Sequence, residues 1–133
     1  MTSLRLLIAD DHEDLLREIT TLVEAEFEVI GIAHNGTALL EAAAELNPDV
    51  VVTDFRMPGL SGIEAGRKLL EQGACKAVVL LTMYADQRLV DRALEAGIRG
   101  YVLKVKAGED LIPAIRSAIR GETFVSSFGV GPV

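Results

Sequence analysis

Short apolar runs recur along this chain at regular intervals, and segments with a different hydrophobic period separate them. The runs cover residues 4–9, 29–33, 50–53, 77–82 and 100–103. Those at 50–53 and 78–81 are almost continuously apolar, which is typical of parallel strands covered on both faces.

The segments between these runs place apolar residues every three or four positions, which is the period of amphipathic helices. They cover residues 13–26, 37–46, 63–72, 87–96 and 109–120. Gly73, Gly97 and Gly121 follow three of them, where helix-terminating glycines are expected. Pro113 lies inside the last segment and predicts a late helix start or a mild kink there.

Five strand–helix units in succession predict an α/β sandwich with a parallel sheet, because right-handed crossovers place helices on both of its faces. We predict the flavodoxin-like (βα)5 doubly wound fold, a five-stranded parallel sheet with strand order 2-1-3-4-5. In that fold, functional groups gather at the carboxyl ends of the strands.

Length and composition narrow the class of protein. The 133 residues fit one domain, and a formal net charge of −7 argues against direct binding to nucleic acid or an anionic membrane. The single cysteine, Cys75, rules out an internal disulfide and fits a reducing compartment. No apolar run approaches the ~20 residues that span a bilayer, and the N-terminus does not read as a secretion signal. We therefore expect a soluble, cytoplasmic protein, with a frayed end or linker at residues 125–133.

Polar residues follow four of the predicted strands at their carboxyl ends. Asp10 and Asp11 follow the first strand, Asp54 ends the third, Thr82 ends the fourth, and Lys104 follows the fifth. An acid after a strand is often only a helix cap, and for either of the first two aspartates alone that explanation is equally good. Because parallel strands open on one edge, we expect three carboxylates, a hydroxyl and an ammonium to form one cleft.

The charges of this cleft indicate what it would bind. Three carboxylates against one lysine leave about −2, and like charges ~4 Å apart repel by roughly 4 kcal/mol at an effective dielectric near 20. A divalent cation would relieve the repulsion, and hard oxygen ligands favour Mg²⁺ over zinc. His12 and His34 are isolated and fit solvated, helix-flanking positions. A carboxylate nucleophile beside a metal and a lysine suits phosphoryl transfer through an aspartyl phosphate.

The motifs at these strand ends resemble those of one family, the receiver domains of two-component response regulators. The resemblance rests on Asp10-Asp11, residues 54–62 (DFRMPGLSG), Leu81-Thr82 and residues 101–104 (YVLK). Stretches at 63–65 and 114–121 are also similar to the NarL/FixJ subfamily, whose members usually carry a C-terminal helix-turn-helix. The resemblance implies a receiver domain at residues 1–121 and a tail at 122–133 that would begin a linker to a missing output domain.

The resemblance implies a role for each matching acidic residue. Asp54 would accept a phosphoryl group from a phosphohistidine on a sensor histidine kinase. Asp11, Asp54 and the main-chain carbonyl of Arg56 would bind Mg²⁺ directly, and Asp10 would act largely through water.

Other residues would respond to the phosphoryl group. Lys104 would pair with it, and Thr82 would move toward it. Tyr101 would change rotamer and repack the face formed by the fourth helix, fifth strand and fifth helix. Arg56 and Tyr84 would flank the cleft.

The function implied is a switch rather than a metabolic enzyme, since the domain would catalyse only its own phosphorylation and dephosphorylation. Phosphorylation would control homodimerisation or an output domain that binds DNA, and a single-domain regulator acting through protein–protein contacts is the alternative. A Mg²⁺-dependent phosphohydrolase would need a general acid two residues after its nucleophile, where His12 and Arg56 stand instead. A pure interaction module would have no reason to gather three carboxylates.

Overall fold

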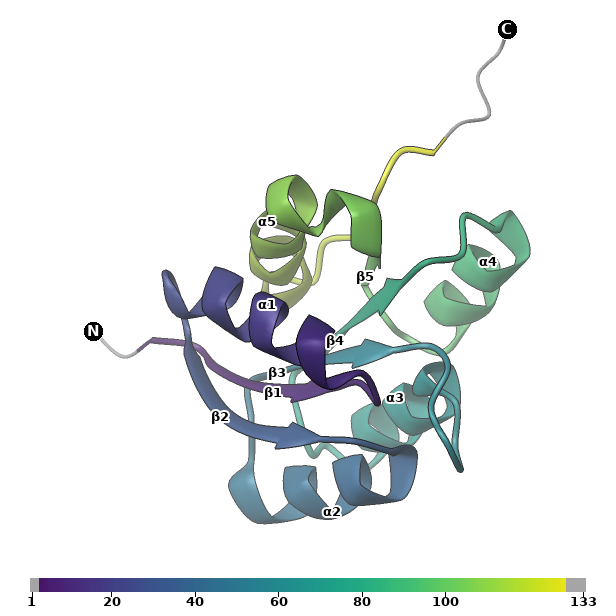
Figure 1. Ribbon diagram of the computed structural model, residues 1–133. Coiled ribbons are helices and arrows are strands. Elements are labelled where there is room, and N and C mark those ends of the chain that lie inside the picture. The colour runs from purple at the N-terminus through teal and green to yellow at the C-terminus, as the bar shows by residue number, and fades with distance from the viewer. Residues whose placement is uncertain (1–2, 129–133) are drawn as a thin grey trace, which may run out of the picture.

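The apolar runs pair into one parallel sheet in the computed structural model, which describes residues 3–128 (Figure 1). Its strands are β1 (Arg5–Ala9), β2 (Glu28–Ala33), β3 (Val50–Asp54), β4 (Ala77–Thr82), β5 (Gly100–Leu103) and β6 (Phe124–Val125). Their spatial order is β2-β1-β3-β4-β5-β6, and every neighbouring pair is parallel. The predicted order 2-1-3-4-5 is confirmed, with one further strand at the β5 edge.

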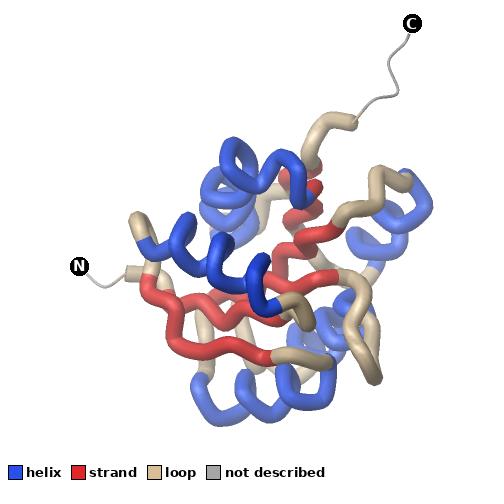
Figure 2. Tube along the Cα trace, viewed as in Figure 1, coloured by secondary structure: helices blue, strands red, loops and turns tan. Residues whose placement is uncertain are grey.

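Five α-helices connect and cover the strands: α1 (Glu13–Glu24), α2 (Gly36–Leu46), α3 (Gly62–Glu71), α4 (Gln87–Glu95) and α5 (Ala107–Ile119). Helices α1 and α5 cover one face of the sheet, and α2, α3 and α4 cover the other, as the blue helices on either side of the red strands in Figure 2 show. This arrangement is the doubly wound, flavodoxin-like sandwich that the sequence predicts.

The two faces of the sheet carry separate cores because side chains alternate along each strand. Leu16, Ile19 and Leu111 belong to the core under α1 and α5. Leu39 and Ile63 belong to the opposite core. All residues of β3 and β4 are buried, which explains why these two segments are the most continuously apolar in the sequence.

Helix ends follow the glycine pattern, with one difference at α5. Gly73, Gly97 and Gly121 adopt φ values of +68°, +93° and +80°, the left-handed conformation that ends helices. Helix α5 begins at Ala107 and contains Pro113, so of the two outcomes expected from this proline, a late start or a mild kink, the late start is wrong. A single 3₁₀ turn, η1 (Lys104–Lys106), leads directly into this helix.

The sixth strand was not predicted from the sequence. The Phe124 N–H donates to the Arg99 carbonyl at 2.8 Å, and the Ser126 N–H donates to the Tyr101 carbonyl at 2.8 Å. Residues 124–128 therefore lie against the sheet, although they fall within the segment expected to be a tail. The rest of that predicted tail, residues 129–133, lies outside the described residues.

Among residues 3–128, no helix has both the length and the apolar character needed to cross a membrane.

Candidate phosphoryl-acceptor site

The carboxyl ends of four adjacent strands bring the predicted site residues to one edge of the sheet. The register pairs Ala9 with Thr53 and Asp54 with Leu81, so that the ends of β1, β3 and β4 are level. Thr82 pairs with Leu103, which places the residue after β5 at the same edge. The convergence of strand ends expected from the sequence is therefore present.

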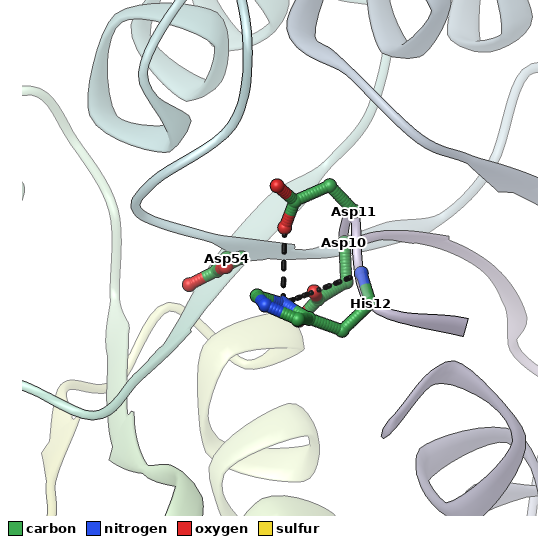
Figure 3. A group of neighbouring side chains, drawn as sticks. All are labelled: Asp10, Asp11, His12 and Asp54. Atoms are coloured by element: carbon green, nitrogen blue, oxygen red, sulfur yellow. Dashed lines mark hydrogen bonds and ion pairs between the residues drawn. The ribbon is translucent and has the colours of Figure 1, made fainter. Parts of the chain in front are cut away.

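Three carboxylates and one imidazole form a tight cluster at this edge (Figure 3). One ligand atom from each of Asp10, Asp11, His12 and Asp54 lies within 4.8 Å of the others. Asp10 and Asp54 are only 4 % and 5 % exposed, whereas Asp11 is open to solvent. Hard carboxylate oxygens at this spacing, with one open side, suit a divalent cation that keeps part of its water shell.

Lys104, the first residue after β5, joins the cluster. Its Nζ lies 3.1 Å from Asp10 Oδ2 and 3.2 Å from Asp54 Oδ2, so the ammonium bridges the two buried carboxylates. The lysine side chain is 13 % exposed. One cation shared by two buried anions leaves negative charge uncompensated, and Asp11 adds to it.

The electrostatics of this arrangement act on the acceptor candidate. Burial raises the pKa of Asp54, and the neighbouring charge of Asp10 raises it further, while Lys104 opposes both effects. Ionised Asp54 is therefore stabilised less in the folded protein than in water. A cation bound beside it would reverse that balance.

His12 contacts the acidic cluster, which its sequence position does not predict. The side chain is exposed, as expected, and the residue precedes α1, but its Nδ1 lies 3.1 Å from Asp10 Oδ1 and 3.0 Å from Asp11 Oδ1. Its backbone N–H also donates to Asp10 Oδ1 at 2.9 Å. The sequence shows that His12 follows the Asp-Asp pair directly. Whether its ring contacts these carboxylates depends on the His12 rotamer, which the sequence does not determine.

Thr82 and Tyr101 are linked through the backbone of Tyr84. The Tyr84 N–H donates to Thr82 Oγ1 at 3.2 Å, and the Tyr84 carbonyl accepts a hydrogen bond from the Tyr101 hydroxyl at 2.5 Å. Tyr101 is fully buried, so its hydroxyl does not reach water, and burial raises its pKa to about 12. Movement of the Thr82 hydroxyl would therefore displace Tyr84 and, through it, change the hydrogen bond of the Tyr101 hydroxyl.

Arg56, which lines the cleft beside Asp11, contacts Tyr84. The Arg56 guanidinium lies 5.6 Å from the centre of the Tyr84 ring, and the Phe55 ring meets that ring edge to face at 6.2 Å. Asp11 and Arg56 line a cleft of about 460 Å³ with the loop after β3. Asp11, an exposed member of the acidic cluster, thus lies in the wall of an open cleft.

The loop after the acceptor is fixed by close backbone packing. The Gly62 N–H donates to the Phe55 carbonyl at 2.8 Å. A Cβ atom at Gly62 would lie 2.0 Å from the Asp54 carbonyl oxygen, closer than any side chain tolerates. Ser61 and Glu64 form a reciprocal capping box that starts α3 at this point. A glycine is therefore required for β3 and α3 to meet directly behind Asp54.

A doubly wound α/β domain with a buried acidic pocket and a bridging lysine at the carboxyl edge of its sheet is the architecture of a receiver domain. The chain belongs to the response regulator receiver domain family, whose model matches residues 6–116. The family resemblance inferred from the sequence motifs is confirmed.

Similar proteins carry this fold and family assignment. LiaR, a transcriptional regulatory protein of Bacillus subtilis, is 35 % identical over 132 residues, 98 % of this chain and 63 % of LiaR. The solved receiver domain of the response regulator NarL from Mycobacterium tuberculosis is 25 % identical with a TM-score of 0.85, covering 92 % of this chain and all of that one. A LuxR-family two-component response regulator from Aurantimonas is 30 % identical with a TM-score of 0.87, covering 94 % and 91 %.

The chain spans about three-fifths of the length of the curated relatives it matches, from 58 % to 63 % for the first of them. The similarity therefore covers one domain of the relatives, whose chains continue beyond the matched region.

The electrostatics of Asp54 lead to a prediction about stability without metal. Since the folded state holds a proton on Asp54 more tightly than the unfolded state does, stability falls as pH rises between the unfolded and folded pKa values. At pH values above the folded pKa, Asp54→Asn should raise the urea midpoint of unfolding in EDTA. Mg²⁺ should reduce the difference in midpoint between the two proteins, because it stabilises the wild type. Asp14→Asn, at a solvent-exposed position, should change stability by no more than about 0.5 kcal/mol. A lower midpoint for Asp54→Asn in EDTA would contradict the assigned charge balance.

Proposed function

We propose that this domain is a Mg²⁺-dependent phosphoacceptor switch of a two-component system. In this proposal, Asp54 accepts a phosphoryl group from a phosphohistidine on a sensor histidine kinase, in the cytoplasm. The observation that carries the proposal is the position of Lys104, whose Nζ is within 3.2 Å of carboxylate oxygens of both Asp10 and Asp54.

The carboxylates fit Mg²⁺ as the resident ion. Asp11 and Asp54 would bind it directly with the main-chain carbonyl of Arg56, and Asp10 would act through water. The support is the set of closely spaced oxygen donors and the open cleft beside Asp11. The ion supplies charge neutralisation for phosphoryl transfer.

The transfer itself requires little covalent chemistry from the domain. A carboxylate oxygen of Asp54 forms a bond to phosphorus while the phosphorus–nitrogen bond of the phosphohistidine breaks, and the electron pair of that bond stays on the imidazole. Lys104 is placed to neutralise charge on the phosphoryl oxygens, because it already contacts Asp54 Oδ2. The domain would also lose the phosphoryl group to water, and we propose no reaction on other substrates.

Phosphorylation would switch the domain through Thr82. If the Thr82 hydroxyl turns to donate a hydrogen bond to a phosphoryl oxygen, the hydrogen bond from the Tyr84 N–H to Thr82 Oγ1 breaks. The Tyr84 carbonyl holds the Tyr101 hydroxyl, so displacement of this loop would release Tyr101 to another rotamer and repack the α4–β5–α5 face. A shift from 1:99 to 99:1 needs ~5.5 kcal/mol, which two or three charge-assisted hydrogen bonds of roughly 1.5–3 kcal/mol each would supply.

The output belongs to the longer protein. Because relatives such as LiaR are named transcriptional regulatory proteins and are longer than this chain, we propose that DNA binding is performed by a separate domain. We propose a receiver domain at residues 1–121, a C-terminal tail or start of a linker at 122–133, and a phosphorylation-dependent homodimer. A single-domain regulator acting through protein–protein contacts is the alternative, which the size of the full gene product decides.

Labelling with a small phosphodonor tests the proposal without the cognate kinase. Acetyl phosphate and Mg²⁺ should give the wild-type protein an acid-labile label, and EDTA should prevent it because the charge of the cluster is then uncompensated. Labelling that is equal with and without Mg²⁺, or no label at all, would refute the proposal.

A further inference from the structure

Residues 124–128, the C-terminal segment, are bound along the outer edge of β5. Two backbone hydrogen bonds join the segment to the strand, as described above, and the yellow chain in Figure 1 runs back past α5 to reach it. Phe124 packs against the core under α1 and α5, whereas Phe128 packs against the core on the opposite face of the sheet. The segment therefore crosses the sheet edge and is held on both faces.

Ser126 is the centre of this attachment. It is 2 % exposed. Its Oγ accepts a hydrogen bond from the Leu103 N–H at 3.1 Å and donates one to Asp110 Oδ2 at 2.7 Å. Leu103 is the last residue of β5, and Asp110 lies in the first turn of α5. One buried hydroxyl therefore ties together the two elements that flank the turn carrying Lys104.

Within the described chain, the 3₁₀ turn η1 lacks side-chain capping hydrogen bonds at its ends. Neither the 3₁₀ turn at 104–106 nor the start of α5 has a side-chain cap, and Val105 is 89 % exposed. Lys106 is held from outside as well, because its Nζ donates to the Ser127 carbonyl at 2.6 Å. The C-terminal segment thus contacts the residue before Lys104 and the second residue after it.

We propose that Ser126 is a positioning residue for Lys104, an inference that rests on the proposed function. By fixing the end of β5 against the first turn of α5, Ser126 holds the Lys104 Nζ between Asp10 and Asp54. Residues 124–128, which fall in the predicted tail, then support the phosphorylation site through β5 and α5. Force or binding that lifts this segment from β5 would lower the rate at which Asp54 is phosphorylated.

Ser126→Ala in the full chain tests this inference. It leaves the Leu103 N–H and the Asp110 carboxylate without their partner, so the rate constant of labelling by acetyl phosphate at saturating Mg²⁺ should fall about fivefold, the lower end of what two net hydrogen bonds contribute. The affinity for beryllofluoride, a phosphoryl mimic, should fall by a similar factor in calorimetry. The affinity for Mg²⁺ alone should not fall, because its ligands are carboxylates that Ser126 does not touch.

Three further variants separate positioning from folding. Ser126→Thr keeps the hydroxyl and should restore the rate. Ser127→Ala loses only an exposed hydroxyl 3.3 Å from Lys106 Nζ and keeps the carbonyl at 2.6 Å, so it should behave as the wild type. Asp110→Ala removes the acceptor at a partly exposed position and should slow labelling in the same direction, which keeps the test decisive if Ser126→Ala does not fold.

The outcomes are distinguishable. If Ser126→Ala is less stable but labels at the wild-type rate, or if its Mg²⁺ affinity falls in parallel with the rate, the positioning role is wrong. If the wild type takes no label, the proposed function fails instead.

Discussion

Asp54→Asn is expected to abolish labelling by acetyl phosphate, because an amide nitrogen and oxygen cannot replace the carboxylate as nucleophile. The surrounding geometry should survive, since asparagine has the same shape and Asp54 is held in β3 by backbone pairing with β4. Acid-labile label on the protein, followed against time at fixed Mg²⁺, is the measurement.

Asp11→Asn is the matched control for this loss. It removes one charge from the same cluster but leaves Asp54 intact, so labelling should persist and require a higher Mg²⁺ concentration. Label retained by Asp54→Asn, or lost by Asp11→Asn at every Mg²⁺ concentration, would contradict the separate roles of nucleophile and metal ligand.

Gly62→Ala is expected to cost at least about 3 kcal/mol of unfolding free energy or to prevent folding. The added Cβ would lie 2.0 Å from the Asp54 carbonyl oxygen and 2.9 Å from its carbonyl carbon. These are backbone atoms of a buried strand, so they cannot move aside as the end of a flexible side chain can. Urea unfolding followed by circular dichroism measures the effect.

Gly108→Ala provides the control for a glycine that packing does not require. Its position lies in the first turn of α5, where an added Cβ meets nothing within 4 Å. Alanine there should stabilise the domain by about 0.5–1 kcal/mol through its higher helix propensity. Equal effects of the two substitutions would contradict the account of the β3–α3 junction.

Much of the fold and site follows from the sequence because the determining signals are local. Buried parallel strands such as β3 must be apolar along their length, and a polar residue such as Asp54 that ends one marks the carboxyl edge. Once the sheet is parallel with strand order 2-1-3-4-5, the backbone positions of Asp10, Asp54 and Lys104 lie at one edge, and the long lysine side chain can reach both carboxylates there.

The features that were missed depend on tertiary contacts. Strand β6 has two residues, too few for a periodic pattern, and it is fixed by the buried hydroxyl of Ser126 in a stretch whose composition suggests a loop. Thr82 and Tyr101 are linked through the backbone N–H and carbonyl of Tyr84. The sequence cannot predict this link, because every residue type except proline has both groups. The contact of His12 with the acidic cluster depends on how one exposed ring turns.

The location of the phosphoryl group tests most directly whether Asp54 is the acceptor. Protein labelled with acetyl phosphate and Mg²⁺ can be reduced with borohydride, which converts an aspartyl phosphate to homoserine, and then mapped by peptide mass spectrometry. We expect homoserine at residue 54 and nowhere else. Modification of Asp10 or Asp11 instead, or phosphate retained on a hydroxyl or imidazole side chain with residue 54 unchanged, would contradict it.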